Sequence, residues 1–285
     1  MRNDILHTIR YFAFFQYPPT LKELYTFHKQ AVDFAQFKKT VDRLVYEEVL
    51  IRKKYVRNNT GFYRYTARGY VSYFKMWKER YDSSNKKMNT LFTFVHNIKY
   101  LSLIQLAGLS GSLSMYNGKK DDDIDLFIIT RKNRLWTTRF VTLFLAQLMG
   151  VRRKRGVTTA KDKICMNLFF EETDLQLPIM KHTEYTAHEV LQMRPLINRG
   201  DTYVRFLDVN KWVFDLFPNA ARSRKIPYQL SPGGIHIPLL GDVLEYILKR
   251  FQLYVMKAHR KDERITETQL WFFPDDFEKK IKITP

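Results

Sequence analysis

Two aspartates, Asp123 and Asp125, stand two positions apart where a strand-like apolar run begins. Side chains two apart on a strand project from the same face, so both carboxylates would lie side by side. Adjacent carboxylates repel each other unless a cation lies between them, and Mg²⁺ prefers a few hard oxygen ligands with phosphate and water completing its shell. The pair therefore predicts a metal site in which Asp123 and Asp125 hold Mg²⁺ or Mn²⁺ and take part in catalysis.

Gly111 and Ser112 precede this pair by about ten residues and follow a strand-like run over residues 103–109. Glycine lets a backbone approach a phosphate closely, and free N–H groups at the start of a helix favour an anion. A Gly-Ser pair alone is common, and an Asp-x-Asp alone is more often a solvated turn. Their combination in this order, leading directly into an apolar strand, predicts a phosphate-binding turn beside a metal site.

The order strand, Gly-Ser, spacer, Asp-x-Asp resembles the signature of the polymerase-β-like nucleotidyltransferase superfamily, with motif support over roughly residues 100–175. The resemblance implies that Gly111 and Ser112 bind the triphosphate of an NTP such as ATP, and that Asp123 and Asp125 bind the metal. It also implies the reaction, in which an NMP passes to a hydroxyl acceptor and pyrophosphate is released.

The superfamily usually places a third carboxylate on a neighbouring strand, and here the sequence departs from that pattern. The candidate strand, residues 164–170, offers Asn167 as its only polar inward residue. An asparagine carbonyl can ligate a metal but cannot accept a proton at neutral pH. Asn167 is thus a candidate metal ligand, while Glu171 and Glu172 at the strand end are candidate substitutes for the missing carboxylate.

Residues 1–65 show three helical patterns followed by two extended arms around an Asn/Gly turn, which is the order of a winged helix. Over residues 1–80 there are 16 Lys and Arg against 7 Asp and Glu, a balance of +9. Cations on the third helix and hairpin suit the phosphates of RNA or DNA. The candidate contacts are Lys38, Lys39, Arg43, Arg52, Lys53, Lys54 and Arg57. Winged helices also serve as protein-docking modules, so this alternative stays open.

The whole chain is predicted to be α+β. We expect a winged helix-turn-helix domain over residues 1–68, a helical connector over 69–100, a nucleotidyltransferase core with a mixed sheet over 101–182, and a C-terminal helical region over 183–285. Within the last region, His188 and Glu189 near a helix start predict a surface or capping role. The basic run over 152–155 is either a solvated turn or an attractant for a triphosphate or polynucleotide.

Composition narrows the class of protein. The chain has 285 residues, 45% apolar and 27% charged, and a formal net charge of +19, which indicates a globular protein with polyanionic partners. One cysteine excludes an intrachain disulfide and a cysteine-based zinc site. The longest apolar stretch, residues 140–149, is too short to span a membrane. We expect a cytoplasmic protein without a membrane partner.

The residues and motifs are compatible with two classes of function. The first is an Mg²⁺-dependent nucleotidyltransferase, whose acceptor is an RNA end or, alternatively, a protein or a small molecule. The second is a non-catalytic, nucleic-acid-binding regulator with a degenerate nucleotidyltransferase domain that senses nucleotides, a reading favoured by Asn167. Residue types and spacing leave open the acceptor, the preferred nucleotide, single or repeated addition, and the oligomeric state.

Overall fold

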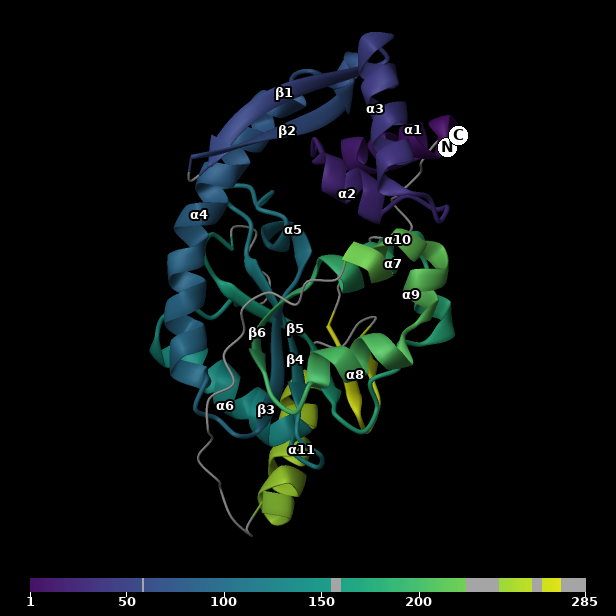
Figure 1. Cartoon of the computed structure of the whole chain (residues 1–285). Coiled ribbons are helices and arrows are strands. Elements are labelled where there is room, and N and C mark those ends of the chain that lie inside the picture. The colour runs from purple at the N-terminus through teal and green to yellow at the C-terminus, as the bar shows by residue number, and fades with distance from the viewer. Residues whose placement is uncertain (58, 155–159, 224–240, 258–262, 273–285) are drawn as a thin grey trace.

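The computed structural model describes residues 1–57, 59–154, 160–223, 241–257 and 263–272. Figure 1 shows a helical cap with a hairpin at one end of a body built on a mixed sheet. The fold is α+β, as the sequence predicts. Among the described residues, no helix has the length and apolar character that a membrane span requires.

The first part of the chain forms three helices and an antiparallel hairpin, which confirms the predicted order of elements. They are α1 (Arg2–Phe14), α2 (Leu21–Thr26), α3 (Phe34–Tyr46), β1 (Leu50–Arg57) and β2 (Thr60–Ala67). Pro18 and Pro19 separate the first two helices, because proline cannot donate to a continuing helix. Thr20 then begins α2 through a reciprocal capping box with Glu23. Their apolar faces close around Phe37, which is fully buried.

A single long helix, α4 (Tyr73–Ile98), connects the hairpin to the sheet and runs along the side of both in Figure 1. A short 3-10 helix, Arg68–Tyr70, leads into it. Trp77 near its start packs under the hairpin, with its ring 4.8 Å from that of Tyr55. Farther along the helix, Leu91 and Phe94 are buried in the core beside the sheet. The helix thus fixes the hairpin relative to the sheet.

Six strands form the central mixed sheet in the order β6-β3-β4-β5-β8-β7. Their bounds are β3 (Ile104–Leu109), β4 (Ile124–Thr130), β5 (Ile164–Glu171), β6 (Arg194–Asn198), β7 (Arg264–Ile265) and β8 (Gln269–Trp271). β4 runs parallel to β5 and antiparallel to β3. The three strands predicted from apolar runs, β3, β4 and β5, are confirmed and lie next to one another in the middle of the sheet.

Helices cover the sheet and fill the region after it. They are α5 (Gly111–Ser114), α6 (Leu135–Leu148), α7 (Glu184–Gln192), α8 (Thr202–Val209), α9 (Trp212–Leu216), α10 (Pro218–Ser223), α11 (Gly241–Lys257) and the 3-10 turn Ile179–Lys181. The region over 183–285, expected to be helical, holds helices α7 to α11 and also the strands β6, β7 and β8, which join the sheet. β6 tolerates Pro195 since it is an edge strand with a single neighbour.

Helix α7 joins the N-terminal helices to the sheet body. The imidazole of His188 is fully buried there, stacked 3.8 Å from the ring of Tyr11 and 4.0 Å from that of Phe27. On the same helix, the carboxylate of Glu184 bonds His7 of α1 and Lys29 of the segment between α2 and α3. The predicted surface role for His188 is therefore wrong: apolar and polar contacts together place it at the boundary between the two parts.

Candidate acidic site at the start of β4

The two predicted aspartates lie together at the start of β4. One carboxylate oxygen from each of Asp123 and Asp125, together with the thiol of Cys165 on β5, lie within 4.8 Å of one another. Cys165 stands directly opposite Asp125 in the parallel β4–β5 register. The strand pairing thus adds the side chain of Cys165 to the two aspartates that the Asp-x-Asp pattern predicts.

Gly111 lies against the carboxylate of Asp125, which joins the predicted phosphate turn to the predicted metal pair. Its φ is +64°, and a Cβ at this position would lie 2.7 Å from Oδ2 of Asp125. A side chain is therefore excluded by both backbone conformation and space. The turn is also held by the backbone, since the N–H of Ser110 donates to the carbonyl oxygen of Asp125 at 3.1 Å.

Asn167 contacts Asp125 as a hydrogen-bond donor. Its Nδ2 lies 2.8 Å from Oδ1 of Asp125, and its own Oδ1 accepts from the thiol of Cys165 at 2.5 Å. A register shift between Leu126 and Phe127 leaves Asn167 without a directly paired residue on β4, as in a β-bulge. Asn167 and Cys165 thus both contact the site, where the amide of Asn167 orients the carboxylate of Asp125.

Burial and mutual repulsion control the charges of the site. Burial, then the negative charge of Asp123, hold the pKa of Asp125 well above its usual value. Burial also raises the pKa of the Cys165 thiol, and the two aspartates add to that rise. Burial therefore favours the neutral forms of both groups in the absence of a cation. The carboxylate oxygens of the two aspartates are hard donors of the kind that Mg²⁺ or Mn²⁺ prefers.

One residue of the basic run reaches this site. Arg153 forms an ion pair with Oδ2 of Asp123 and lies 3.4 Å from the sulfur of Cys165. Arg155, in the same run, lies outside the described residues. The run is thus not simply a solvated turn, because Arg153 supplies a cation to the acidic pair.

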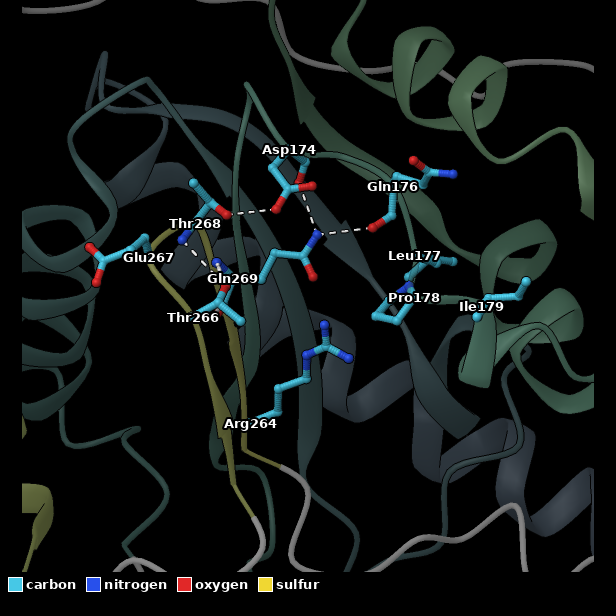
Figure 2. A pocket seen from close by; sticks show the side chains of 10 residues that line it. All are labelled: Asp174, Gln176, Leu177, Pro178, Ile179, Arg264, Thr266, Glu267, Thr268 and Gln269. Atoms are coloured by element: carbon cyan, nitrogen blue, oxygen red, sulfur yellow. Dashed lines mark hydrogen bonds between the residues drawn. The ribbon is translucent and has the colours of Figure 1, made fainter.

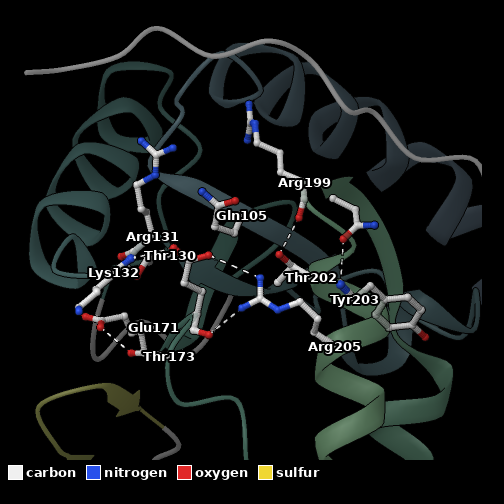
Figure 3. A network of polar contacts seen from close by, with 12 residues as sticks. Gln105, Thr130, Arg131, Lys132, Glu171, Thr173, Arg199, Thr202, Tyr203 and Arg205 are labelled. Atoms are coloured by element: carbon white, nitrogen blue, oxygen red, sulfur yellow. Dashed lines mark hydrogen bonds and ion pairs between the residues drawn. The ribbon is translucent and has the colours of Figure 1, made fainter.

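The glutamates expected to replace the third carboxylate lie at the other end of the sheet. In the β4–β5 register, Cys165 pairs with Asp125 and Glu171 pairs with Thr130. Glu171 is therefore six positions beyond Cys165 on β5, which corresponds to roughly 20 Å along an extended strand. Its carboxylate accepts from the hydroxyl of Thr173 at 2.6 Å (Figure 3). Glu172 pairs with Arg205 at 3.7 Å. The expectation that either serves the acidic site is wrong, because the strand carries them away from it.

A third carboxylate does reach the site, from α7. Oε2 of Glu189 accepts a hydrogen bond from the backbone N–H of Gly111 at 3.1 Å. Burial raises the pKa of Glu189 to about 7. The predicted capping role of Glu189 is wrong, since Thr183 caps the helix instead. In the sequence, Glu189 is marked only by its position after His188 on an amphipathic helix.

A buried lysine on α4 holds the loop between Gly111 and Asp123. The Nζ of Lys87 donates to the carbonyl oxygens of Lys120 and Asp122 at 2.9 and 2.6 Å, and to Oδ1 of Asp162 at 3.0 Å. In the same loop, the hydroxyl of Ser112 donates to Oδ2 of Asp122 at 3.4 Å. Ser112 is exposed at this turn, where its hydroxyl remains within reach of a ligand.

The seven cations proposed to contact nucleic acid are all exposed on α3 and β1. Three of them form ion pairs with acidic side chains: Lys38 and Arg52 with Asp42, and Arg43 with Glu47. Lys39, Lys53 and Lys54 lie on the open surface. Arg57, at the end of β1, instead turns towards the sheet body, with its guanidinium 5.4 Å from the ring of Tyr116.

Shallow, open clefts lie on the surface of the described residues. One, of about 690 Å³, borders the site loop and is lined by Arg80, Lys86, Lys119, Lys120 and Lys161, with Glu79, Asp82 and Asp162 among them. The other, of about 580 Å³, lies beside β7 and β8 (Figure 2) and includes Asp174, Arg264 and Gln269. The first cleft is lined by Lys119 and Lys120 of the loop that leads to Asp123.

Comparisons with protein-family models, with curated proteins and with solved structures find no match for this chain. The geometry of the acidic site is therefore the basis for proposing a function.

Proposed function

We propose that the protein is a nucleotidyltransferase that moves an NMP from an NTP to a hydroxyl acceptor. One observation supports this most directly: the backbone of Gly111 lies against the carboxylate of Asp125, so close that no side chain fits between them. A phosphate-binding turn in contact with a paired carboxylate is the arrangement that the nucleotidyltransferase motif requires. The Gly111–Asp125 approach ties the two halves of that motif into one site.

In this proposal, Asp123 and Asp125 hold Mg²⁺ or Mn²⁺, and Gly111 and Ser112 contact the phosphates of an NTP such as ATP. A divalent cation supplies charge neutralisation for the triphosphate and lowers the pKa of the acceptor hydroxyl. The acceptor oxygen forms a bond to the α-phosphorus while the bond to the departing pyrophosphate breaks. Glu189 is suited to accept the hydroxyl proton, because its pKa of about 7 is near the working pH.

We further propose an RNA end as the acceptor and a winged-helix role for residues 1–68. The exposed cations Lys39, Lys53 and Lys54 lie on α3 and β1 in the N-terminal part of the chain. The lysine-lined cleft of about 690 Å³ beside the site loop offers a cationic route for a polynucleotide. Binding through these groups should weaken as salt rises.

The test is label transfer with matched variants. The protein is incubated with each α-labelled NTP, Mg²⁺ or Mn²⁺, and total RNA or lysate. We expect transfer by the unmodified protein and a loss of about 100-fold or more in both Asp123→Asn and Asp125→Asn. Asp121→Asn removes an exposed carboxylate from the same loop and should keep the activity. No transfer with any NTP and acceptor would reject the enzyme proposal.

A second function is favoured by the ion pair between Arg153 and Asp123, and by Asn167 in the strand position where a third carboxylate was expected. With these features, the site would bind a nucleotide without turnover, and the N-terminal part would bind nucleic acid as a regulator. Saturable NTP binding that Asp125→Asn alters, combined with the absence of transfer, would support this reading.

A further inference from the structure

The phenol of Tyr116 lies between two guanidinium groups that come from distant parts of the chain. Arg194, the first residue of β6, lies 4.9 Å from the ring centroid, and Arg57, the last residue of β1, lies 5.4 Å from it. Arg57 also lies 5.7 Å from the ring of Tyr81 on α4. Two aromatic rings thus support the cation that the hairpin brings to the sheet body.

The positive charge of this cluster is not compensated by acidic side chains. Among the described residues, neither Arg57 nor Arg194 forms an ion pair with a carboxylate. Burial alone would raise the pKa of the Tyr116 phenol, but hydrogen bonds and charge from Arg194 and Arg57 outweigh burial and lower it. Two neighbouring guanidiniums without a carboxylate present several donors to one oxyanion.

The cluster adjoins the phosphate turn. Arg194 pairs with Leu109, the last residue of β3, in the β3–β6 register. The chain continues from Leu109 through Ser110 into α5. Tyr116 lies two residues after the end of α5, and its N–H donates to the carbonyl oxygen of Leu113 at 3.0 Å. Strand pairing and the short helix therefore place Tyr116 and Arg194 beside the turn that begins at Gly111.

The hairpin holds Arg57 in a defined position. Tyr55 lies on the same face of β1, and its hydroxyl donates to the carbonyl oxygen of Phe74 at 3.1 Å. The rings of Tyr55 and Trp77 make an edge contact at 4.8 Å. The end of β1 is thereby anchored on α4 two residues before Arg57.

We propose that Arg57, Tyr116 and Arg194 form an anion-binding site for a phosphate group, so that the N-terminal hairpin supplies part of the substrate site. Arg57 then acts with the sheet body and not with the open cationic surface of α3 and β1. The site does not depend on the carboxylate pair or on nucleotidyl transfer, since it needs only the phosphate oxygens of a ligand. Those oxygens come from a nucleotide triphosphate or from a polynucleotide strand.

The test measures binding without metal or turnover. Affinities of inorganic triphosphate and of a 12-nucleotide single-stranded RNA are determined in EDTA at fixed low salt. Arg57→Gln and Arg194→Gln should each weaken binding about tenfold, the ratio that 1.4 kcal/mol represents. Lys75→Gln removes the same charge from the exposed surface of α4 and should stay within about twofold of the unmodified protein. Thermal melting confirms that each variant is folded.

The two probes separate the sources of phosphate. Selective loss with triphosphate assigns the site to the nucleotide, and selective loss with RNA assigns it to the polynucleotide. Equal effects of Arg57→Gln and Lys75→Gln, or no binding of either probe by the unmodified protein, would overturn the site. This binding is measured without metal and without turnover, so failure of the anion site and failure of the transferase proposal appear in separate assays and give different results.

Discussion

Oε2 of Glu189 lies 3.1 Å from the backbone nitrogen of Gly111 and accepts its hydrogen bond. This contact joins α7 to the turn between β3 and α5, across 78 positions of sequence. The N–H that donates to Glu189 belongs to the turn that we propose for phosphate binding, so the carboxylate lies beside that turn. The charge of Glu189 is therefore linked to the state of the site.

Replacing Glu189 with Gln should flatten the dependence of stability on pH. Burial raises the pKa of Glu189 to about 7 in the folded protein, against an ordinary value of 4.5. Between these values the folded form binds more protons than the unfolded form, so stability falls as pH rises from about 4.5 to 7. The difference corresponds to about 3 kcal/mol at most. Glutamine stays neutral and can still accept from Gly111.

Urea unfolding of both proteins at pH 5 and pH 8, in EDTA, measures this effect. We expect the unmodified protein to lose stability between the two pH values and Glu189→Gln to lose markedly less. Glu79→Gln, which removes an exposed glutamate from α4, should follow the unmodified protein. Identical pH dependence in Glu189→Gln and the unmodified protein would contradict the role given to burial.

The parts of the site that the sequence predicts are local in the chain. Gly111 and Asp125 are close because a short turn and strand pairing bring them together, and both follow from spacing. Glu189 lies 64 positions beyond Asp125, and its approach depends on the packing of His188 between Tyr11 and Phe27. No periodic pattern in the sequence encodes that packing, so the sequence points to glutamates at the end of β5 and not to Glu189 of α7.

The alternation of side chains along β5 predicts one more residue at the site than Asn167 alone. Cys165 precedes Asn167 by two positions, so the rule that predicted an inward Asn167 applies equally to Cys165. The edge strand β6 escapes prediction for a different reason, because it contains Pro195, and proline is confined to edge strands, strand starts and bulges. β8 has only three residues, too few to show a period of two. Short and edge strands depend on their partners more than on their own pattern.

Replacing Lys87 with Met should loosen the loop before the aspartates. Lys87 is 1% exposed and donates to the carbonyl oxygens of Lys120 and Asp122. Methionine has a similar length but no donor, so both oxygens and the carboxylate of Asp162 would lose a partner. We expect a loss of about 2 kcal/mol in the free energy of unfolding, together with weaker nucleotide binding, because Asp123 directly follows this loop.

Thermal or urea unfolding checks the first expectation, and titration with an NTP in Mg²⁺ checks the second. Lys86→Met changes the adjacent, exposed lysine of α4 by the same charge and should leave both quantities close to those of the unmodified protein. If Lys87→Met and Lys86→Met behave alike, the buried lysine does not hold the loop.

Replacing Glu184 with Gln should weaken the joint between the N-terminal helices and α7. Its carboxylate lies 3.0 Å from Nε2 of His7 and 2.8 Å from Nζ of Lys29. Burial would raise the pKa of Glu184, but the hydrogen bonds from His7 and Lys29 outweigh it and lower the pKa to about 2. The contribution to stability is thus complete above about pH 4.5, the ordinary value, and is lost as pH falls towards 2.

We therefore expect Glu184→Gln to be about 1 kcal/mol less stable than the unmodified protein at pH 7, allowing for solvent screening of a partly exposed group. The gap should narrow at pH 3, where the glutamate of the unmodified protein begins to take up its proton. Urea midpoints at the two pH values measure it. Glu48→Gln breaks an exposed pair with Arg68 and should change neither midpoint. A gap that is equal at pH 7 and pH 3 would mean that Glu184 contributes through packing and not through its charge.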